Sequence, residues 1–556
     1  MSGISSSAQR GSAPVPVPTA DDRRNRLDFR LVPAALSAWA IALVCVHATA
    51  SYAVRLSAAA TVVSLLALGA GVLLRRHRRA ALVAAHLCLA AVCSAGVAHS
   101  AYLSLQTVES TGWAAAVEDP GRLEVQLRVT EDAQPLREPG WGGQQRVRAT
   151  ATVHRFRPAG EQEWIPVRGA YAVVIAQVPH GVHPDWLLTA GVRYSGEVRA
   201  SPTDPGERAS ALLFPATEPL AELPADAWTD LMGVFGHLRE TTSRAAASTV
   251  ADAPALLPGV ILGDRSGQDE ELTEAMRVSG LSHMTVVSGT HCALVMGALM
   301  GVLRICRTPR WCTPVAVLLG LVLFVLLVQP APSVIRAAVM GGIGAVAVFA
   351  GRGRVSSSLL MVCVLVLLVY DPWYCVEPAF QLSVAATAGI VLVGRRLKEI
   401  FDPWMPAIVS GPLALATASQ IFVTPVLLPI AGGVNTYSVV ANILAGPLLL
   451  LVTVPGTVAA LLSVVAPGVT HLLLNVAAVP AAVIGVIGRS VAGLPQSLAE
   501  WPPGWLGWVL VVVYLAGSVV MSRLLIEARR PGQWELVLLT VCAGSFAAVV
   551  IPGPTG

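Results

Sequence analysis

Long apolar runs constrain the fold of this chain more than any other feature. About 20 consecutive apolar residues are needed for a helix to cross the hydrocarbon core of a bilayer, and runs close to this length recur along the sequence. Only 13% of the 556 residues are charged and 54% are hydrophobic, whereas a soluble protein carries about a quarter charged residues. The sequence therefore predicts a mainly α-helical, polytopic membrane bundle of roughly 13 spans. The predicted spans are residues 31–50, 56–74, 80–103, 280–301, 314–328, 334–350, 356–370, 376–393, 405–429, 437–465, 469–487, 506–521 and 535–551.

Arginine clusters near the first apolar runs predict the orientation of the chain. Residues 75–79 read Arg-Arg-His-Arg-Arg, and further arginines lie in residues 23–26. Short arginine-rich loops stay on the cytoplasmic side of a membrane. We therefore expect residues 1–30 to be a disordered cytoplasmic tail, residues 31–104 to form three spans, and the chain after them to emerge outside. A cleaved signal peptide is the competing interpretation of the first run, and the two spans that follow at once disfavour it.

Residues 105–230 are polar and predict a separate extracytoplasmic β-domain. Four segments with alternating apolar residues predict strands, namely residues 122–129, 145–156, 171–178 and 192–199. Several short strands in about 100 residues are typical of a small barrel, and an OB-like fold is one option. The region holds 11 arginines against 17 acidic residues, a net charge of −6. This balance is not typical of a nucleic-acid groove.

Four arginines in the second predicted strand are the local exception to the acidic character of this domain. Arg146 and Arg148 share one strand face, and Arg155 and Arg157 share the opposite face unless a bulge intervenes. They are candidates for DNA contact. Solvated strand arginines are the favoured interpretation over a track for phosphates.

The predicted channel domain, residues 231–556, centres on the run 280–301, which is apolar but unusually polar for a span. Polar side chains at membrane depth are costly unless they find partners or line a wet cavity. Ser288 and His291 lie three apart and share a helix face, and Ser282 and His283 precede them. These four residues are candidates for a translocation path or gate, with hydrogen bonding between helices as an equally weighted alternative. Small residues at every fourth position predict close helix packing; they are Gly289, Ala293, Gly297 and Gly301.

Other polar residues near predicted span ends extend this candidate path. Arg336 could bind a phosphate through two hydrogen bonds, although snorkelling or pairing with an acid is slightly favoured. Glu377 and Gln381 follow one turn apart on another predicted span. Before the bundle, residues 228–250 predict an amphipathic helix on the membrane surface or against the bundle.

The motifs of cofactor and ATP sites are absent from the sequence. There is no Walker A loop, so we expect no ATPase in this polypeptide. The two histidines of residues 280–301 lack a third ligand and are weak as a metal site. No cofactor, no metal and no enzymatic activity are therefore expected.

Taken together, ordered sequence blocks across residues 210–490 resemble the ComEC family of competence proteins, the membrane channels of bacterial DNA uptake. The blocks are Leu256-Leu257-Pro258-Gly259-x-x-Leu262-Gly263-Asp264, Gly280-Leu281-Ser282-His283 with Ser288-Gly289-x-His291, Pro332-Ser333-x-x-Arg336-Ala337, Asp371-Pro372-Trp373 with Pro378-x-Phe380-Gln381-Leu382-Ser383, and Asn442-x-Leu444-x-x-Pro447.

This resemblance implies an inner-membrane channel that imports single-stranded DNA during natural transformation, with the β-domain outside the bacterial cytoplasmic membrane. It implies the lipid bilayer, a DNA receptor and a cytoplasmic ATPase or helicase as partners, and a second copy of the chain is a further partner to consider. Many relatives carry a C-terminal metallo-β-lactamase-like domain. This sequence has no H-x-H-x-D-H pattern, so we expect no such nuclease activity.

Two alternatives from other classes stay open at this point. A polytopic membrane enzyme could use the Ser288 and His291 face, and it should then bring an acid near this pair, for which Glu377 is the one candidate. A small-molecule transporter is the other alternative. It should show inverted repeats with broken helices, and no clear internal repeat is visible.

Overall fold

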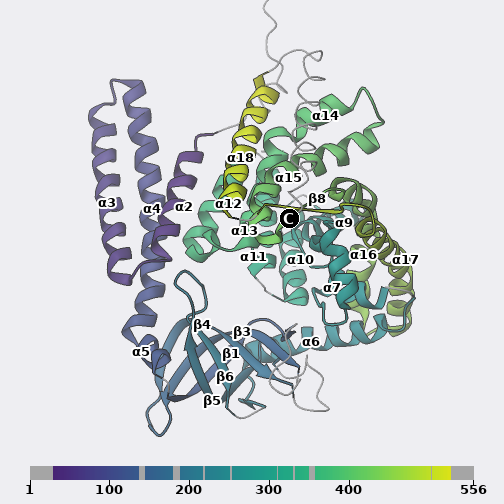
Figure 1. The fold of residues 1–556 in the computed structure, drawn as a ribbon, viewed down its shortest axis with the longest axis horizontal. Coiled ribbons are helices and arrows are strands. Elements are labelled where there is room, and N and C mark those ends of the chain that lie inside the picture. Colours follow the sequence, from purple (N-terminus) through teal and green to yellow (C-terminus); the bar gives the residue numbers. More distant parts are fainter. Residues whose placement is uncertain are drawn as a thin grey trace, which may run out of the picture.

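The computed structural model describes residues 29–527, with gaps at residues 120, 137–144, 179–187, 217–218, 251–252, 310, 330–331, 350–356 and 503. It contains a large helical part and a small β-barrel, and Figure 1 shows the barrel at one end of the molecule. The predicted helical bundle with a small β-domain is confirmed. The predicted span 535–551 and nearly all of the predicted tail 1–30 lie outside the described residues.

Three helices precede the barrel, namely α2 (Val32–Cys45), α3 (Ala50–Leu73) and α4 (Arg78–Ser110). The predicted run 31–50 is interrupted before its end, because Thr49 is extended at the N-cap of α3, a position that threonine favours. Helices α3 and α4 pack against each other, and the turn between them carries the basic residues 75–79. Figure 1 shows this turn at the end of the pair that points away from the barrel.

The short helix α5 (Trp113–Glu118) leads into a closed barrel of five main strands. Each strand pairs with its neighbour in the order β1-β3-β4-β6-β5, and β1 pairs with β5 to close the barrel. The β4–β6 pair is parallel and all other pairs are antiparallel, which fits the OB-like fold expected from the sequence. The strands are β1 (Arg122–Val129), β2 (Gln134–Pro135), β3 (Arg146–Pro158), β4 (Ile165–Gln177), β5 (Arg193–Pro202), β6 (Ala211–Pro215) and β7 (Ala221–Glu222).

Alternating apolar side chains fill the barrel, as a strand period of two requires. Trp113 and Phe156 meet edge to face in the core, with ring centroids 5.2 Å apart. The buried indole nitrogen of Trp113 donates to Ser210 Oγ at 2.8 Å, so its burial leaves no polar group unsatisfied. The barrel therefore has its own apolar core.

A β-bulge at His154 interrupts the alternation of β3. Gln126 lies opposite Arg155 and Leu127 lies opposite Val153, so His154 has no partner on β1. His154 and Arg155 are consequently both exposed. The bulge places Arg155 and Arg157 on the same outward face as Arg146 and Arg148, which is the arrangement that the sequence left open.

Helix α6 (Ala227–Ala246) connects the barrel to the bundle. It lies against the bundle, in contact with α7 (Ala253–Leu262), α10 (Cys312–Val328), α16 (Ser438–Leu462) and α17 (Pro467–Ala492). This amphipathic helix was predicted to lie either on the membrane surface or against the bundle, and the structure shows it against the bundle. Helix α7 is buried at the centre of this packing, with Leu256, Leu257 and Ile261 at most 1% exposed.

Residues 280–301 do not form one continuous helix, contrary to the prediction. After α8 (Glu270–Val278), Gly280 has a positive φ of 76° and ends the helix. A 3-10 turn (Ser282–Met284) follows, and α9 (Gly289–Ile305) begins only after Ser288. The β-branched run at residues 285–287 disfavours a helix, and Ser288 is a favoured N-cap residue. Ser282 and His283 therefore do not share a helix face with His291.

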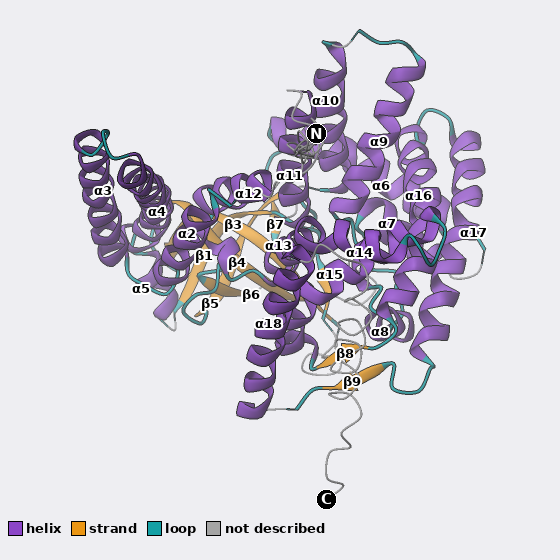
Figure 2. Cartoon of the chain, turned by 90° about the horizontal axis from the view of Figure 1, so that it is seen from above, coloured by secondary structure: helices purple, strands orange, loops and turns teal. Residues whose placement is uncertain are grey.

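The rest of the bundle contains both long and short helices. Among the described residues, six helices are long and apolar enough to cross a membrane, and seven further apolar helices are shorter. Figure 2 shows α9, α10, α16 and α17 on the side of the bundle away from α3 and α4. The elements not yet named are α11 (Pro332–Phe349), α12 (Ser357–Tyr370), a 3-10 turn (Pro372–Cys375), α13 (Pro378–Gly389), a π-helical turn (Ile390–Gly394), α14 (Arg395–Phe401), α15 (Ala407–Ala431), β8 (Gly433–Asn435), β9 (Leu498–Glu500) and α18 (Gly504–Glu527).

Candidate functional site

The sequence blocks singled out above converge in space. A Cβ atom at Gly259 of α7 would lie 2.6 Å from the carbonyl oxygen of Thr285, in the segment before α9. A Cβ atom at Gly280 would lie 2.6 Å from Cβ of Ser438, at the start of α16. Only glycine permits such close approach. Segments far apart in the sequence therefore surround the start of α9.

Ser288 and His291 form a reciprocal cap at the start of α9. His291 Nδ1 accepts the backbone N–H of Ser288 at 3.0 Å, and Ser288 Oγ lies 3.0 Å from the same nitrogen. This is the geometry of a capping box, with an imidazole in place of the usual Glu or Gln. Because Nδ1 accepts the backbone N–H, the proton of the neutral ring resides on Nε2.

His291 Nε2 is the part of this pair that capping does not explain. The side chain is fully buried, at 0% exposure, and Nε2 has no hydrogen-bond partner among the described residues. A buried unpaired donor costs roughly 1–3 kcal/mol. His291 thus presents an unsatisfied N–H inside the bundle.

Arg336 is the second buried donor with unsatisfied atoms, and it lies close to the first. Gly289 at the start of α9 packs against Ala337 of α11, since a Cβ atom at Gly289 would lie 3.7 Å from Cβ of Ala337. Arg336 precedes this contact residue and is 8% exposed. Its Nε and Nη1 lack hydrogen-bond partners among the described residues, while Nη1 lies 3.9 Å from Glu377 Oε2. A guanidinium held in this way can donate hydrogen bonds to an anionic oxygen with little rearrangement.

Glu377 and Gln381 lie at the start of α13, next to Arg336. Glu377 occupies the N-cap position of α13, and Gln381 Nε2 donates to the carbonyl oxygen of Cys375 at 2.8 Å. The structure therefore brings Arg336 and Glu377 together as an ion pair. It assigns Gln381 a bond that holds the turn before α13.

The small-residue face of α9 packs closely at only one of its four positions. Gly289 meets Ala337, whereas nothing among the described residues lies within 4 Å of a Cβ atom at Gly297 or Gly301. Ala293 is exposed. Within the described chain, α9 therefore makes no close contact at Gly297 or Gly301.

A polar contact between the barrel and the bundle was not predicted from the sequence. Asp132, in the segment after β1, bonds to the side-chain amide of Gln329 at the end of α10. Gln329 has a positive φ of 76°, which is rare for a residue other than glycine and marks a strained, structurally enforced position. Arg239 of α6, 8% exposed, lies 3.7 Å from Asp132 Oδ2. The sequence holds one signal for Gln329, which is its position before Pro330 and between two predicted spans.

A second contact joins the segment between β5 and β6 to the bundle. Arg208 Nη2 lies 2.5 Å from Asp371 Oδ2, and the guanidinium stacks 4.1 Å above the ring of Tyr171. Trp373 Nε1 donates to the carbonyl oxygen of Glu207 at 3.1 Å. Burial raises the pKa of the Asp371 carboxyl, and Arg208 opposes that shift. The motif Asp371-Pro372-Trp373 therefore serves as a docking point for the barrel.

The four candidate arginines of β3 have different surroundings. Arg157 is bound by Glu124 through Nε at 2.7 Å and Nη2 at 2.5 Å, and it stacks over Trp164. Arg148 is exposed at the other end of the strand, next to Arg146. Arg155 is also exposed and lines a pocket. The four residues thus share a face without forming one continuous track of unpaired charges.

The geometry around His291 differs from that of a hydrolytic Ser-His site. Such a base needs a free ring nitrogen facing the serine hydroxyl and an acid on the other nitrogen. Here Nδ1 accepts a backbone N–H, and no acidic side chain bonds to Nε2 within the described residues. The same part of the chain holds no group of three or more side chains that could bind a metal ion.

Comparison with known proteins relates part of the chain to competence proteins. A family model described as "Competence protein" matches residues 260–526. This match supports a relationship to the ComEC family of competence proteins. A segment of 149 residues is 27% identical to ComE operon protein 3 of Bacillus subtilis (strain 168) and covers 27% of this chain and 19% of that protein. No solved structure matches the chain.

The competence region contains every residue proposed for the path and excludes the barrel. It begins within α7 and ends within α18. Ser288, His291, Arg336 and Glu377 all lie in it. The barrel contacts this region through Gln329 and Asp371, which therefore mark where the region joins the β-barrel.

Proposed function

We propose that this competence protein is a channel that imports single-stranded DNA across the bacterial cytoplasmic membrane. The β-barrel lies on the outer side, and the strand passes the start of α9, next to Ser288, His291, Arg336 and Glu377. The polypeptide acts as a conduit and not as an enzyme. A DNA receptor outside and an ATPase or helicase inside supply the strand and the driving force.

The observation that supports this proposal is that His291 and Arg336, two of several buried side chains of the bundle with unsatisfied polar atoms, lie on the neighbouring helices α9 and α11. His291 Nε2 and Arg336 Nε and Nη1 are buried N–H groups without partners among the described residues. In a purely structural core such groups find partners. Donors held ready for an anion fit a path through which phosphates pass, since phosphate oxygens accept hydrogen bonds from guanidinium groups.

Orientation follows from the basic turn between α3 and α4. This turn carries residues 75–79 at the end away from the barrel. A cytoplasmic turn places the barrel outside. DNA would then meet the barrel before it enters the bundle.

Deletion of the gene tests the channel directly. In a host that takes up DNA, we expect the deletion to abolish entry of labelled DNA into the cytoplasm, while DNA still binds at the cell surface. Normal entry of DNA in the deletion strain would overturn the proposal. A loss of surface binding alone would assign the protein to an earlier step.

Two substitutions at His291 separate a path role from a capping role. His291→Gln keeps a side-chain acceptor for the Ser288 N–H, as in a standard capping box, but moves the buried donor. His291→Ala removes both. We expect both variants to reduce transformation at least tenfold at normal membrane levels, and Arg336→Gln to do the same.

His471→Ala is the matched control, since His471 lies exposed on α17, and it should transform normally. If His291→Gln transforms normally and only His291→Ala loses transformation, His291 has a capping role alone.

A further inference from the structure

The barrel is turned so that the loops that usually flank a nucleic acid in OB folds contact the bundle instead. OB folds commonly bind oligonucleotides on the face of their second and third strands, between the loops that follow the first and fourth strands. Here those loops are residues 130–145 and 203–210. The first bonds to Gln329 through Asp132, and the second bonds to Asp371 through Arg208 at 2.5 Å. A strand approaching from outside meets a different wall of the barrel.

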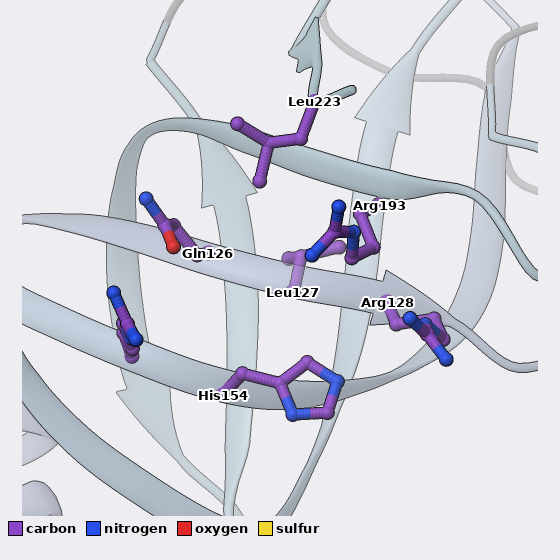
Figure 3. Close-up of a pocket in the computed structure, with 7 residues that line it drawn as sticks. Gln126, Leu127, Arg128, His154, Arg193 and Leu223 are labelled. Atoms are coloured by element: carbon purple, nitrogen blue, oxygen red, sulfur yellow. The ribbon is translucent and has the colours of Figure 1, made fainter. Parts of the chain in front are cut away.

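On the wall formed by β1, β3 and β5 lies a pocket of about 310 Å³. Figure 3 shows Leu223 on one side of it and His154 on the other, with Arg193 between them and Arg128 at one end. The seven lining residues are Gln126, Leu127, Arg128, His154, Arg155, Arg193 and Leu223. Three of them are arginines, in a domain whose net charge is negative.

The arginines of this pocket are held in place by the chain and exceed the acids that face them. Arg128 and Arg193 are opposite each other in the register of β1 and β5. Both approach Asp226, Arg128 through a hydrogen bond and Arg193 with Nε 3.7 Å from Oδ2.

Asp226 is itself fixed, since it caps α6 by accepting the N–H of Thr229 at 2.9 Å. The hydrogen bonds from Thr229 hold the pKa of the Asp226 carboxyl at about 2, below its ordinary value. This carboxylate therefore stays ionised. One carboxylate thus positions two guanidinium groups.

Arg155 supplies charge that no carboxylate of the described chain neutralises. It is exposed, and no ion pair or hydrogen bond joins its side chain to another described residue. The bulge at His154 brings it to this wall. The buried Nε atoms of Arg128 and Arg193 also lack hydrogen-bond partners in the described chain. The pocket therefore offers excess positive charge at one place.

We propose that this pocket binds the phosphodiester backbone of the incoming DNA strand. The inference rests on the proposed function and assigns the barrel its contact with DNA. No Phe, Tyr or Trp of the described residues lines the pocket, so it holds the backbone and does not stack bases. Contact is then independent of sequence, as phosphate contacts are.

Binding of a fluorescent single-stranded oligonucleotide to the full chain, reconstituted in nanodiscs of zwitterionic lipid, tests this pocket. We expect Arg155→Gln to weaken binding several-fold and to lower the slope of log K against log salt by about 0.7, the value for one lost phosphate contact on a single strand. An oligonucleotide of the same sequence with a neutral methylphosphonate backbone should not bind.

Arg199→Gln is the matched control. Arg199 is an exposed arginine on β5, opposite Arg122 at the far end of the β1–β5 pair, and its replacement removes the same charge without touching the pocket. We expect this variant to bind like the parent. Equal losses of affinity in both variants would show that only the overall charge of the barrel matters, and would overturn the proposal.

Competition distinguishes DNA from the other common source of phosphodiesters, a phospholipid headgroup. Short-chain phosphatidylglycerol at the phosphate concentration of the oligonucleotide should leave DNA binding unchanged, and its displacement of DNA would overturn the assignment to DNA. The channel proposal is tested separately, by DNA uptake in the His291 and Arg336 variants, in which Arg155 is unchanged. Its failure is therefore distinguishable from failure of the pocket proposal.

Discussion

His154 shows how one additional residue in a strand can build a charged surface. Without the bulge, strict alternation would direct Arg155 and Arg157 into the barrel or would force the apolar residues outward. With it, Phe156 stays in the core at 1% exposure, and Arg155 reaches the pocket wall. The same bulge exposes the His154 ring beside Arg128 and Arg193. The residue type at position 154 therefore affects the chemistry of the pocket.

The His154 ring predicts a pH dependence of DNA binding. Desolvation and the positive charges of Arg128 and Arg193 hold the pKa of His154 below its usual value, and Asp226 acts weakly in the opposite direction. A bound phosphate favours the imidazolium and raises this pKa, so binding takes up a proton. Affinity for the oligonucleotide should therefore rise as pH falls from about 7 to about 5.5.

His154→Gln isolates this effect from the other charges at the pocket. The variant should bind like the parent at pH 8 and should lose most of the increase at low pH. The measurement is the dissociation constant at fixed ionic strength across this range. Identical pH profiles for the two proteins would show that the ring does not contact the strand.

At the scale of elements, α6 and the loops of the barrel determine how the two parts of the molecule meet. Asp226 caps α6 at the barrel, and Arg239 reaches Asp132 from the same helix. Ser463 Oγ donates to the carbonyl oxygen of Leu238 at 3.3 Å, which ties α6 to the bundle. Helix α6 is therefore bonded both to the barrel and to the bundle, and the Arg208–Asp371 pair is a second connection between these two parts.

Asp371→Asn tests the second of these connections. The asparagine can still accept the N–H of Trp373, which Asp371 accepts at 3.1 Å, but it removes the charge opposite Arg208. A hydrogen bond between charged groups contributes roughly 1.5–3 kcal/mol. We expect amide hydrogen exchange of residues 203–210 to become at least tenfold faster.

The same substitution at Asp402 provides the control. Asp402 pairs with Lys398 at 2.7 Å and bonds to Ser410, far from the barrel in Figure 1, where α14 lies at the opposite end. Asp402→Asn should leave exchange in residues 203–210 unchanged. Unchanged exchange in Asp371→Asn would show that the ion pair does not hold the barrel.

Sequence reasoning located elements well where local pattern determines them. The strand predicted at residues 122–129 coincides with β1, because alternation and flanking turn residues specify a half-buried strand. It failed at residues 280–288, where an apolar composition suggested a helix but β-branched residues and a capping pair end it. It could not find the Asp132–Gln329 and Arg208–Asp371 contacts, because each joins residues far apart in the sequence that only the fold brings together.

Two basic segments lie at one end of the molecule, and the barrel lies at the other. The basic turn of residues 75–79 and the basic helix α14 both lie at the end away from the barrel in Figure 1. Such an asymmetry is what the positive-inside rule requires of a multi-pass protein. Under the proposed orientation, the pocket of β1, β3 and β5 faces the outer side, where a strand would first arrive.

Cysteine labelling in intact cells tests this orientation. Native Cys306 is exposed in the turn after α9, next to the basic residues Arg304 and Arg307, so we expect a membrane-impermeant maleimide to reach it only after the cells are opened. In a Cys306→Ser background, Arg199→Cys on the barrel should be labelled in intact cells, whereas Arg76→Cys should be labelled only in opened ones. Both new cysteines replace exposed arginines, so reactivity differs by side of the membrane and not by burial. Labelling of Arg76→Cys from outside, with Arg199→Cys protected, would invert the molecule and place the barrel where DNA leaves the channel.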